Sequence, residues 1–266
     1  MKPDLITVFG VTFHSYRTVL AVAFAVCTIL AVRESRRRGG AVVLTPVLGV
    51  WALAGALLGA RIFYVLQYEC IQALAQALLV WKGGLVFYGG LAGGTLAVAA
   101  YCRLRGMRVL PVADIGAPYL ALGEAITRIG CFLNGCCYGV ACAWPWGVSF
   151  PQGSVAYQDH LDAAILGPNL TQTVPLHPTQ LYMTAGLVAV FVMLKLLLSK
   201  KAWDGSVVCA YLLLYGILRF LVEILRGDSL RGAAGLTLSQ SISVAVALAA
   251  LIALMVQTRR GRAATG

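Results

Sequence analysis

Long uninterrupted stretches of apolar residues are the feature that most constrains how this chain can fold. A stretch of about 20 apolar residues crosses the roughly 30 Å hydrocarbon core of a bilayer as an α-helix. We predict an all-α, polytopic membrane helix bundle of about seven transmembrane helices with an outer cap. The predicted spans lie near residues 12–32, 43–66, 85–102, 111–133, 179–199, 205–225 and 237–257.

Composition supports a membrane protein and argues against other classes. Hydrophobic residues make up 60% of the chain and charged residues 12%, whereas soluble domains are roughly half apolar and a quarter charged. The net charge is +11, but the basic residues form short clusters between apolar stretches and no basic stripe interleaved with aromatics. We therefore expect membrane lipids, and no nucleic acid, as partners. The chain shows no duplicated halves, which argues against a permease or channel.

The distribution of Lys and Arg predicts the orientation, because positive residues favour the cytoplasmic side. Basic clusters follow the first, third, fifth and seventh spans, and residues 134–177 contain no Lys or Arg. The N-terminus is thus predicted outside and the C-terminus inside. We expect a single transmembrane domain, 1–266, with outer excursions at about 67–84 and 134–178. Within the first excursion, residues 71–81 could lie along the interface as an amphipathic helix.

Several ionisable side chains lie inside or at the edge of the apolar stretches. Each costs a few kcal/mol at the bilayer centre, so such groups usually face a bundle interior or a wet cavity. Pairing for packing, or snorkelling to the interface, is the structural alternative. These residues are Arg17, Arg61, Asp114, Glu124, Arg128, Arg219, Glu223 and Arg226.

Arg219, Glu223 and Arg226 share one helix face because they are spaced four and three residues apart. Glu223 can hold one arginine in place while the other meets an anion. A guanidinium fork suits phosphate. A structural ladder of ion pairs remains the alternative interpretation.

Two further segments combine glycine, proline and histidine. The glycine-rich residues 83–94 open the third span, where Gly90 and Gly94 predict close helix packing; space for a lipid chain beside Tyr88 is the alternative. His177 precedes Pro178, which fits a first helical turn. His177 is then a helix cap or a proton-transfer residue at the mouth of the bundle.

Four cysteines cluster at the outer end of the fourth span: Cys131, Cys136, Cys137 and Cys142. The outer face of a cell membrane is oxidising, which favours a disulfide. Their spacing does not match the usual C-x-x-C pattern, so we predict no metal. Scattered cysteines elsewhere, such as Cys70, are interpreted as packing residues.

Five segments in order resemble one known family, the prolipoprotein diacylglyceryl transferases. Residues Thr127–Gly139, TRIGCFLNGCCYG, resemble the family's signature segment. His177–Tyr182, HPTQLY, resembles its HPSQLYE motif, and Arg219–Arg226, RFLVEILR, resembles its RFxxEFxR motif. Leu58–Tyr64 resembles its GGR segment, and Tyr16 stands where the family has a functional tyrosine in the first span.

The resemblance implies a seven-helix bundle in the bacterial inner membrane. It also implies transfer of the diacylglyceryl group of phosphatidylglycerol to the lipobox cysteine of a prolipoprotein, releasing glycerol phosphate without a cofactor. Arg128 and Arg219 would then hold the phosphate, and Glu223 would orient Arg219. The remaining residues expected to bind substrate are Tyr16, Arg61, Asn134, Gly139, Gln180 and Arg226.

The chain departs from the family pattern where protons are handled. Tyr88 stands in place of the histidine of the family's FHGG motif, Cys131 and Cys136 replace an Asn and a Glu of the signature, and Met183 replaces a Glu. We expect Tyr88 to accept the proton of the acceptor thiol, with His177 or His14 as alternatives. These changes also leave open a related lipid-headgroup transferase with a different acceptor.

Overall fold

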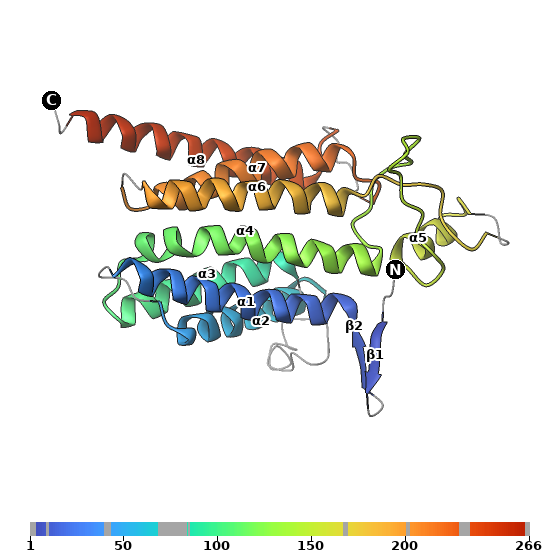
Figure 1. Cartoon of the computed structure of the whole chain (residues 1–266), viewed down its shortest axis with the longest axis horizontal. Helices are drawn as coiled ribbons and strands as arrows, with labels where there is room; N and C mark the ends of the chain where they lie inside the picture. The colour runs from blue at the N-terminus through green and yellow to red at the C-terminus, as the bar shows by residue number, and fades with distance from the viewer. Residues whose placement is uncertain are drawn as a thin grey trace. The chain divides into compact units, whose positions relative to one another are not determined.

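The structure, a computed structural model, describes residues 4–8, 11–39, 44–68, 84, 86–166, 170–200, 203–228 and 235–263. This part of the chain contains a short hairpin and eight helices (Figure 1). Their bounds are β1 Asp4–Val8, β2 Val11–His14, α1 Ser15–Arg38, α2 Pro46–Tyr68, α3 Phe87–Leu104, α4 Val109–Asn134, α5 Val155–Asp162, α6 Thr179–Ser199, α7 Ser206–Ile224 and α8 Leu238–Ala263.

Six of these helices, α1, α2, α4, α6, α7 and α8, are long and apolar enough to cross a membrane. The predicted multi-pass helical protein is therefore confirmed. α3 is helical where the third span was predicted, but its glycines and Arg103 make it less apolar. The first span was predicted to start at residue 12, which is wrong, because Val11–His14 form β2 and pair with β1. Val, Thr and Phe in this stretch favour a strand.

The chain divides into two compact units. Unit 1 contains residues 1–27 and 116–266, and unit 2 contains residues 28–115. The amphipathic helix predicted at 71–81, and Cys70, lie outside the described residues.

In unit 2, glycines bring α2 and α3 together. A Cβ added to Gly59 would overlap the carbonyl oxygen of Gly89, and one added to Gly93 would overlap that of Gly55. The prediction that glycines mediate close packing is confirmed, although the closest contacts fall one residue before Gly90 and Gly94. The core of this unit is formed by Val32, Leu44, Leu48, Tyr101, Cys102, Val112 and Ile115.

In unit 1, a stripe of alanines on α4 faces α6 and α7. Ala117, Ala121 and Ala125 are fully buried and spaced four residues apart, so they lie on one side of α4. The residues that pack against them are Met183, Leu187, Val190, Leu194 and Leu198 of α6 and Val207 and Val222 of α7. α6, α7 and α8 run beside one another (Figure 1).

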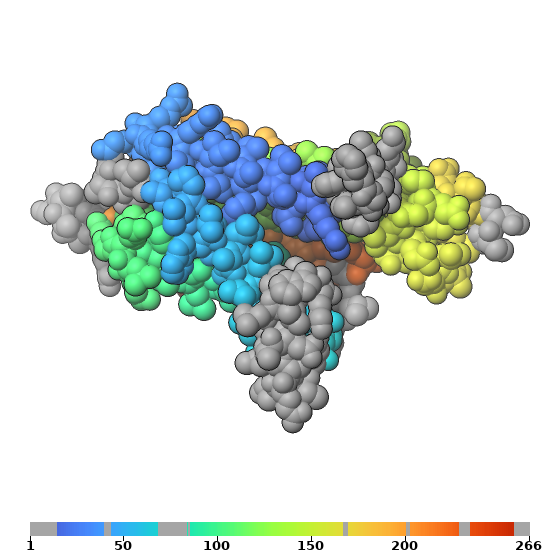
Figure 2. Space-filling view, turned by 90° about the horizontal axis from the view of Figure 1, so that it is seen from below, coloured from blue at the N-terminus to red at the C-terminus, as the bar shows by residue number. Residues whose placement is uncertain are grey.

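The segment predicted as a cap, 134–178, contains α5 and a set of short backbone pairings. Tyr138, Phe150, Ala156 and Leu176 form its own small core. Figure 2 shows part of this segment, in yellow-green, as a rounded mass of side chains, and Figure 1 shows the segment at one end of α4 and α6. The segment therefore has enough apolar contacts to hold a fixed conformation beside the helix ends.

Candidate functional site

Three arginines from separate parts of the sequence line one pocket in unit 1. Arg128 comes from α4, Arg219 from α7, and Arg226 from the residues just after α7. The pocket is small and narrow. Its lining residues are Arg128, Cys137, Thr179, Gln180, Met183, Arg219, Val222 and Arg226. A pocket lined by guanidinium groups is suited to an anionic ligand.

Arg128 is held by one edge only. Its Nη2 donates to Glu124 Oε1 at 2.8 Å, and the same carboxylate oxygen accepts from the Tyr215 hydroxyl at 3.1 Å. The Arg128 Nε is buried, and no group among the described residues accepts a hydrogen bond from it. Because leaving a buried donor unpaired is costly, this atom indicates a place for a ligand.

Glu223 fixes the second arginine. Its Oε2 lies 2.8 Å from Arg219 Nη2 and 3.6 Å from Arg226 Nη1. Arg219 Nε also donates to Ser239 Oγ at 2.9 Å. Arg226 is held chiefly by Asp228, through a bidentate pair of hydrogen bonds of 2.8 and 2.7 Å. The predicted ion-pair ladder is therefore present, and the anion site in the same residues stays a prediction.

The start of α8 holds Glu223 from the other side. Thr237 donates from its hydroxyl to Glu223 Oε1 at 3.0 Å. Thr237 and Gln240 also cap α8 reciprocally, because each side chain accepts from the other's backbone N–H at 3.1 and 3.0 Å. The helix cap thus positions a carboxylate in the neighbouring helix, and Glu223 is 3% exposed.

Gly139 lies between two other site segments. Its N–H donates to the His177 carbonyl at 2.9 Å, and it forms a backbone bridge with Arg226. A Cβ here would come 2.6 Å from the His177 Cβ and 2.7 Å from the Leu225 carbonyl oxygen. Only glycine allows this close approach. The structure gives Gly139 a packing function that the predicted substrate contact did not include.

His177 is held close to α6. Its Nδ1 lies 3.1 Å from the Tyr182 hydroxyl, and the two rings meet edge to face. The imidazole is half-buried, and His177 is not among the residues that line the pocket.

Thr179 and Gln180, which follow His177 and Pro178 in the HPTQLY motif, support the cysteine segment. Thr179 Oγ1 donates to the Cys137 carbonyl at 2.6 Å, and Gln180 Nε2 donates to the Cys136 carbonyl at 2.7 Å. Both side chains are 1% exposed. The Gln180 Oε1 is buried and accepts no hydrogen bond from the described residues. Cys137 has a φ of 59°, a left-handed conformation that costs a non-glycine residue about 1–2 kcal/mol.

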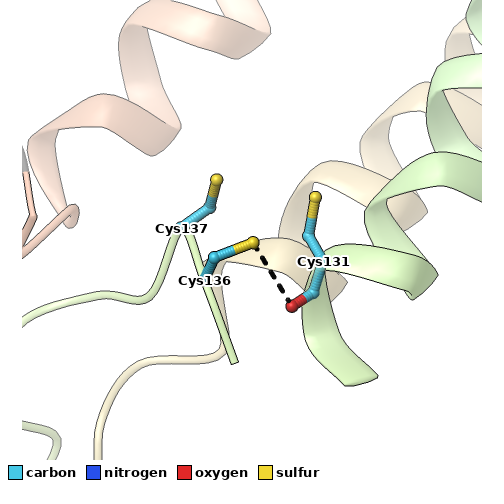
Figure 3. Close-up of side chains that lie close together, drawn as sticks. All are labelled: Cys131, Cys136 and Cys137. Atoms are coloured by element: carbon cyan, nitrogen blue, oxygen red, sulfur yellow. Dashed lines mark hydrogen bonds between the residues drawn. The ribbon is translucent and has the colours of Figure 1, made fainter. Parts of the chain in front are cut away.

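The four outer cysteines are free thiols in the structure, so the predicted disulfide is not formed. The Sγ atoms of Cys131, Cys136 and Cys137 lie within 4.8 Å of one another (Figure 3). Cys142 stands apart from this group and its thiol is directed at the Trp144 carbonyl. Hydrogen bonds from Cys131 and Cys136, and the positive charges of Arg128 and Arg226, lower the pKa of the Cys137 thiol.

Two further predicted residues lie near these thiols. Tyr16 of α1 is half-buried close to Cys131, Cys136 and Arg128. Asn134 ends α4, two residues before Cys136. The structure therefore brings both residues beside the thiol cluster, although neither lines the pocket itself.

Tyr88 and Arg61 belong to unit 2 and are described with it. Tyr88, in the first turn of α3, is 39% exposed and contacts Phe87 edge to face. Arg61 of α2 is 2% exposed, and its guanidinium carbon lies 5.2 Å from the centre of the Tyr64 ring. His14 is described by its backbone alone, in β2.

Sequence reasoning missed several residues that hold the arginines or their carboxylate partners: Tyr215, Asp228, Thr237 and Ser239. Asp228 could have been found, because it follows Arg226 by two residues at the end of a span. The T-x-x-Q pattern at 237–240 is a helix-start signal, but it gives no indication that Thr237 also contacts Glu223.

Comparison with known proteins identifies relatives over nearly the whole chain. The sequence profile of prolipoprotein diacylglyceryl transferase matches residues 3–256. A phosphatidylglycerol–prolipoprotein diacylglyceryl transferase of Clostridium tetani is 32% identical over 92% of this chain and 93% of its own length. The second such enzyme of Clostridium perfringens is 30% identical over 100% and 99%. That of Cereibacter sphaeroides is 35% identical over 79% and 76%.

Proposed function

The chain belongs to the prolipoprotein diacylglyceryl transferase family, and on that premise we propose that it transfers the diacylglyceryl group of phosphatidylglycerol to a prolipoprotein. The acceptor is the thiol of the lipobox cysteine. A thioether forms at the glyceryl carbon, the bond from that carbon to the phosphate oxygen breaks, and glycerol phosphate leaves. The enzyme is a multi-pass membrane transferase.

The arrangement of three guanidinium groups around one pocket is the observation that carries this proposal. The phosphodiester of the substrate carries one negative charge, and the departing glycerol phosphate gains a second. Groups that interact more strongly with the transition state than with the substrate accelerate the reaction. Arg128 and Arg219 supply that interaction, and the buried Nε of Arg128 is available to a phosphate oxygen.

The carboxylates around the pocket act as positioning groups. Glu223 holds Arg219 at 2.8 Å, and Asp228 holds Arg226 in a bidentate pair. Each arginine is thereby oriented before the substrate arrives, which reduces the entropic cost of binding.

Polar groups next to the arginines bind the rest of the headgroup. Gln180 presents a buried Oε1 beside the pocket, which can accept a hydrogen bond from a glycerol hydroxyl. Tyr16 and Asn134 lie beside the cysteine segment and complete the polar surroundings. We also propose that Arg61 binds substrate.

The acceptor thiol must lose a proton before it attacks carbon, because the thiolate is the nucleophile. We assign the first proton acceptor to Tyr88, whose hydroxyl is on an exposed side chain. His177 is the alternative, although its Nδ1 is already in contact with Tyr182.

The reaction takes place at the outer surface of the bacterial inner membrane, with the N-terminus outside and the C-terminus in the cytoplasm. Arginines in the last turn of α1, at positions 36–38, and Arg103 in the last turn of α3 support this orientation. The cap segment 134–178, which lacks Lys and Arg, then lies outside.

The direct test uses purified protein, phosphatidylglycerol vesicles and a synthetic lipobox peptide. The expected result is a gain in peptide mass of one diacylglyceryl unit, which is absent when the peptide cysteine is replaced by serine. Vesicles in which another anionic phospholipid replaces phosphatidylglycerol test the donor. Binding of phosphatidylglycerol without any mass gain on the peptide would contradict the proposed acceptor.

A further inference from the structure

Three sulfur atoms meet at the edge of the arginine pocket. The Sγ atoms of Cys131, Cys136 and Cys137 all lie within 4.8 Å of one another, and Cys137 is itself a pocket residue (Figure 3). Thiolates are strong ligands for zinc and similar metal ions. No step of the phosphate chemistry described above uses these thiols.

The end of α4 explains how this cluster arises despite an unusual spacing. Gly135 has a φ of 73°, its N–H donates to the Phe132 carbonyl, and the Cys136 N–H donates to the Cys131 carbonyl at 3.1 Å. These two hydrogen bonds form a Schellman motif, which brings the second residue after a helix back against its last turn. Cys136 is therefore returned to Cys131, five residues earlier in the sequence.

Buried side chains then fix the third thiol. Thr179 and Gln180 donate to the carbonyls of Cys137 and Cys136 and hold Cys137 in its left-handed conformation. Strain of this kind persists only where the surroundings enforce it, and it is concentrated at functional sites. The thiol cluster is thus held by α4 and by the start of α6.

We propose that Cys131, Cys136 and Cys137 bind a zinc ion whose fourth position is open to the arginine pocket, and that the acceptor thiol binds there as a thiolate. Three protein ligands with one open position are typical of catalytic zinc sites. This inference rests on the proposed transferase function and assigns the group that activates its acceptor.

The geometry and the charges fit this site. Zinc–sulfur bonds of about 2.3 Å place tetrahedral ligands about 3.8 Å apart, so the thiols need to move inward by no more than about 1 Å. Three thiolates and Zn²⁺ carry one net negative charge. Arg128 and Arg226 line the same pocket as Cys137, and their positive charges offset that excess, which a buried site would otherwise not tolerate.

The reaction balances with zinc in this position. The acceptor S–H loses its proton on coordination, because a metal deprotonates a coordinating thiol. The thiolate electron pair forms the new S–C bond to the glyceryl carbon. The C–O bond breaks, its electron pair leaves on the phosphate oxygen, and the arginines receive the additional charge. The metal keeps its charge throughout, and the released proton passes to water.

A metal-bound acceptor also accounts for a departure from the family pattern. Tyr88 stands in place of a histidine, and a phenol is a weak base at neutral pH. With zinc making the thiol acidic, a weak base such as a phenol is sufficient to take up the proton. The expectation of no metal, drawn from spacing alone, is replaced by this proposal.

Metal binding is tested first, without reference to activity. Purified, reduced protein freed of metal is titrated with Co²⁺, whose thiolate complexes have a charge-transfer band in the near ultraviolet. We expect one Co²⁺ per chain, displaced by Zn²⁺. Cys131→Ser, Cys136→Ser and Cys137→Ser should each lose the band. Cys142→Ser is the matched control and should keep it, because this thiol lies outside the cluster.

A cooperative thermal unfolding transition of each variant in detergent shows that it is folded. A wild-type protein with three reactive thiols in the cluster and no cobalt–thiolate band would overturn the proposal. So would a disulfide between two of these cysteines in protein purified without a reducing agent.

Acceptor binding is tested second. The lipobox peptide should shift the cobalt bands, and its Cys→Ser form should not; an unchanged spectrum overturns the open fourth position. Chelation should abolish diacylglyceryl transfer, and Zn²⁺ should restore it. Full transfer by metal-free protein would overturn the zinc proposal while the transferase function stands. A peptide-dependent cobalt shift with no transfer from any phosphatidylglycerol vesicle would instead overturn the transferase function.

Discussion

The hydroxyl of Thr179 donates a 2.6 Å hydrogen bond to the carbonyl oxygen of Cys137, 42 residues earlier in the chain. Thr179 begins α6, and Cys137 follows the end of α4. The bond joins the HPTQLY motif to the signature segment. Two motifs that are separate in the sequence therefore form one structural unit beside the arginine pocket.

Thr179→Val should destabilise the protein, because it leaves the buried carbonyl of Cys137 without this hydrogen bond. We expect a loss of about 1–3 kcal/mol in the free energy of unfolding, measured by thermal unfolding in detergent. Thr95→Val is the control, since the exposed Thr95 hydroxyl bonds within its own helix to the Leu91 carbonyl. Equal unfolding midpoints for the two variants would contradict a supporting function for Thr179.

Arg128→Ala and Arg219→Ala should each reduce transfer severely. Each removes a guanidinium from the pocket where negative charge develops, and loss of one such group typically lowers kcat by about 100- to 1000-fold. Mass spectrometry of the lipobox peptide measures the rate. The exposed Arg103 of α3 provides the control, and Arg103→Ala should leave the rate unchanged. Full activity of either pocket variant would exclude the phosphate clamp.

Glu223→Gln tests a positioning residue. Glutamine keeps an oxygen for the Thr237 hydroxyl but loses the charge that orients Arg219. We expect KM for phosphatidylglycerol to rise and kcat/KM to fall by about tenfold or more, since removing one charge of a buried ion pair costs about 2–5 kcal/mol.

Glu34→Gln is the matched control for Glu223→Gln, because Glu34 forms an i,i+4 pair with Arg38 at the end of α1. A variant with unchanged KM but lower thermal stability would assign Glu223 a structural function alone.

Tyr88→Phe should slow the thiol step more than it weakens lipid binding. Phenylalanine keeps the ring contact with Phe87 and removes the hydroxyl that passes on the proton. Single-turnover transfer, compared with phosphatidylglycerol binding by the same variant, separates the two effects. If the single-turnover rate equals that of wild type, the proton takes another route, and His177→Gln becomes the variant to measure.

Gly59→Ala should destabilise the packing of α2 on α3. The added methyl group would overlap the carbonyl oxygen of Gly89, and overpacking of this kind costs about 1–3 kcal/mol. Gly116→Ala is the control, because a Cβ there meets no atom within 4 Å. That substitution should be neutral or stabilising by up to about 1 kcal/mol. The thermal unfolding midpoint should therefore fall for Gly59→Ala, and it should stay unchanged or rise for Gly116→Ala.

The helices and the family could be predicted from the sequence because both depend on short, continuous segments. Apolar stretches of bilayer length predict spans whatever surrounds them, and TRIGCFLNGCCYG or RFLVEILR can be recognised without coordinates. The first residue of α1 was harder to predict from the sequence. Val11–His14 read as the beginning of an apolar stretch, but pairing with β1 makes them a strand.

Side-chain convergence was decided by the tertiary structure. Ala117, Ala121 and Ala125 form the face of α4 that packs on α6. With that face towards α6, Arg128 lies in the pocket that it shares with Arg219 and Arg226. A paired-glycine repeat offers two helix faces one residue apart, so the sequence favoured Gly90 where the fold uses Gly89.

The cysteines show the same difference between what the sequence predicts and what the tertiary structure decides. Their positions in the sequence predicted a disulfide and no metal. Sequence spacing is a poor guide to the distance between two thiols when the chain reverses direction between them. A glycine in the left-handed conformation turned the chain after α4, and two buried side chains of α6 held it there. The sequence by itself determined a membrane transferase and predicted that its arginines bind an anion. Only packing between distant segments decided that three thiols would meet beside those arginines.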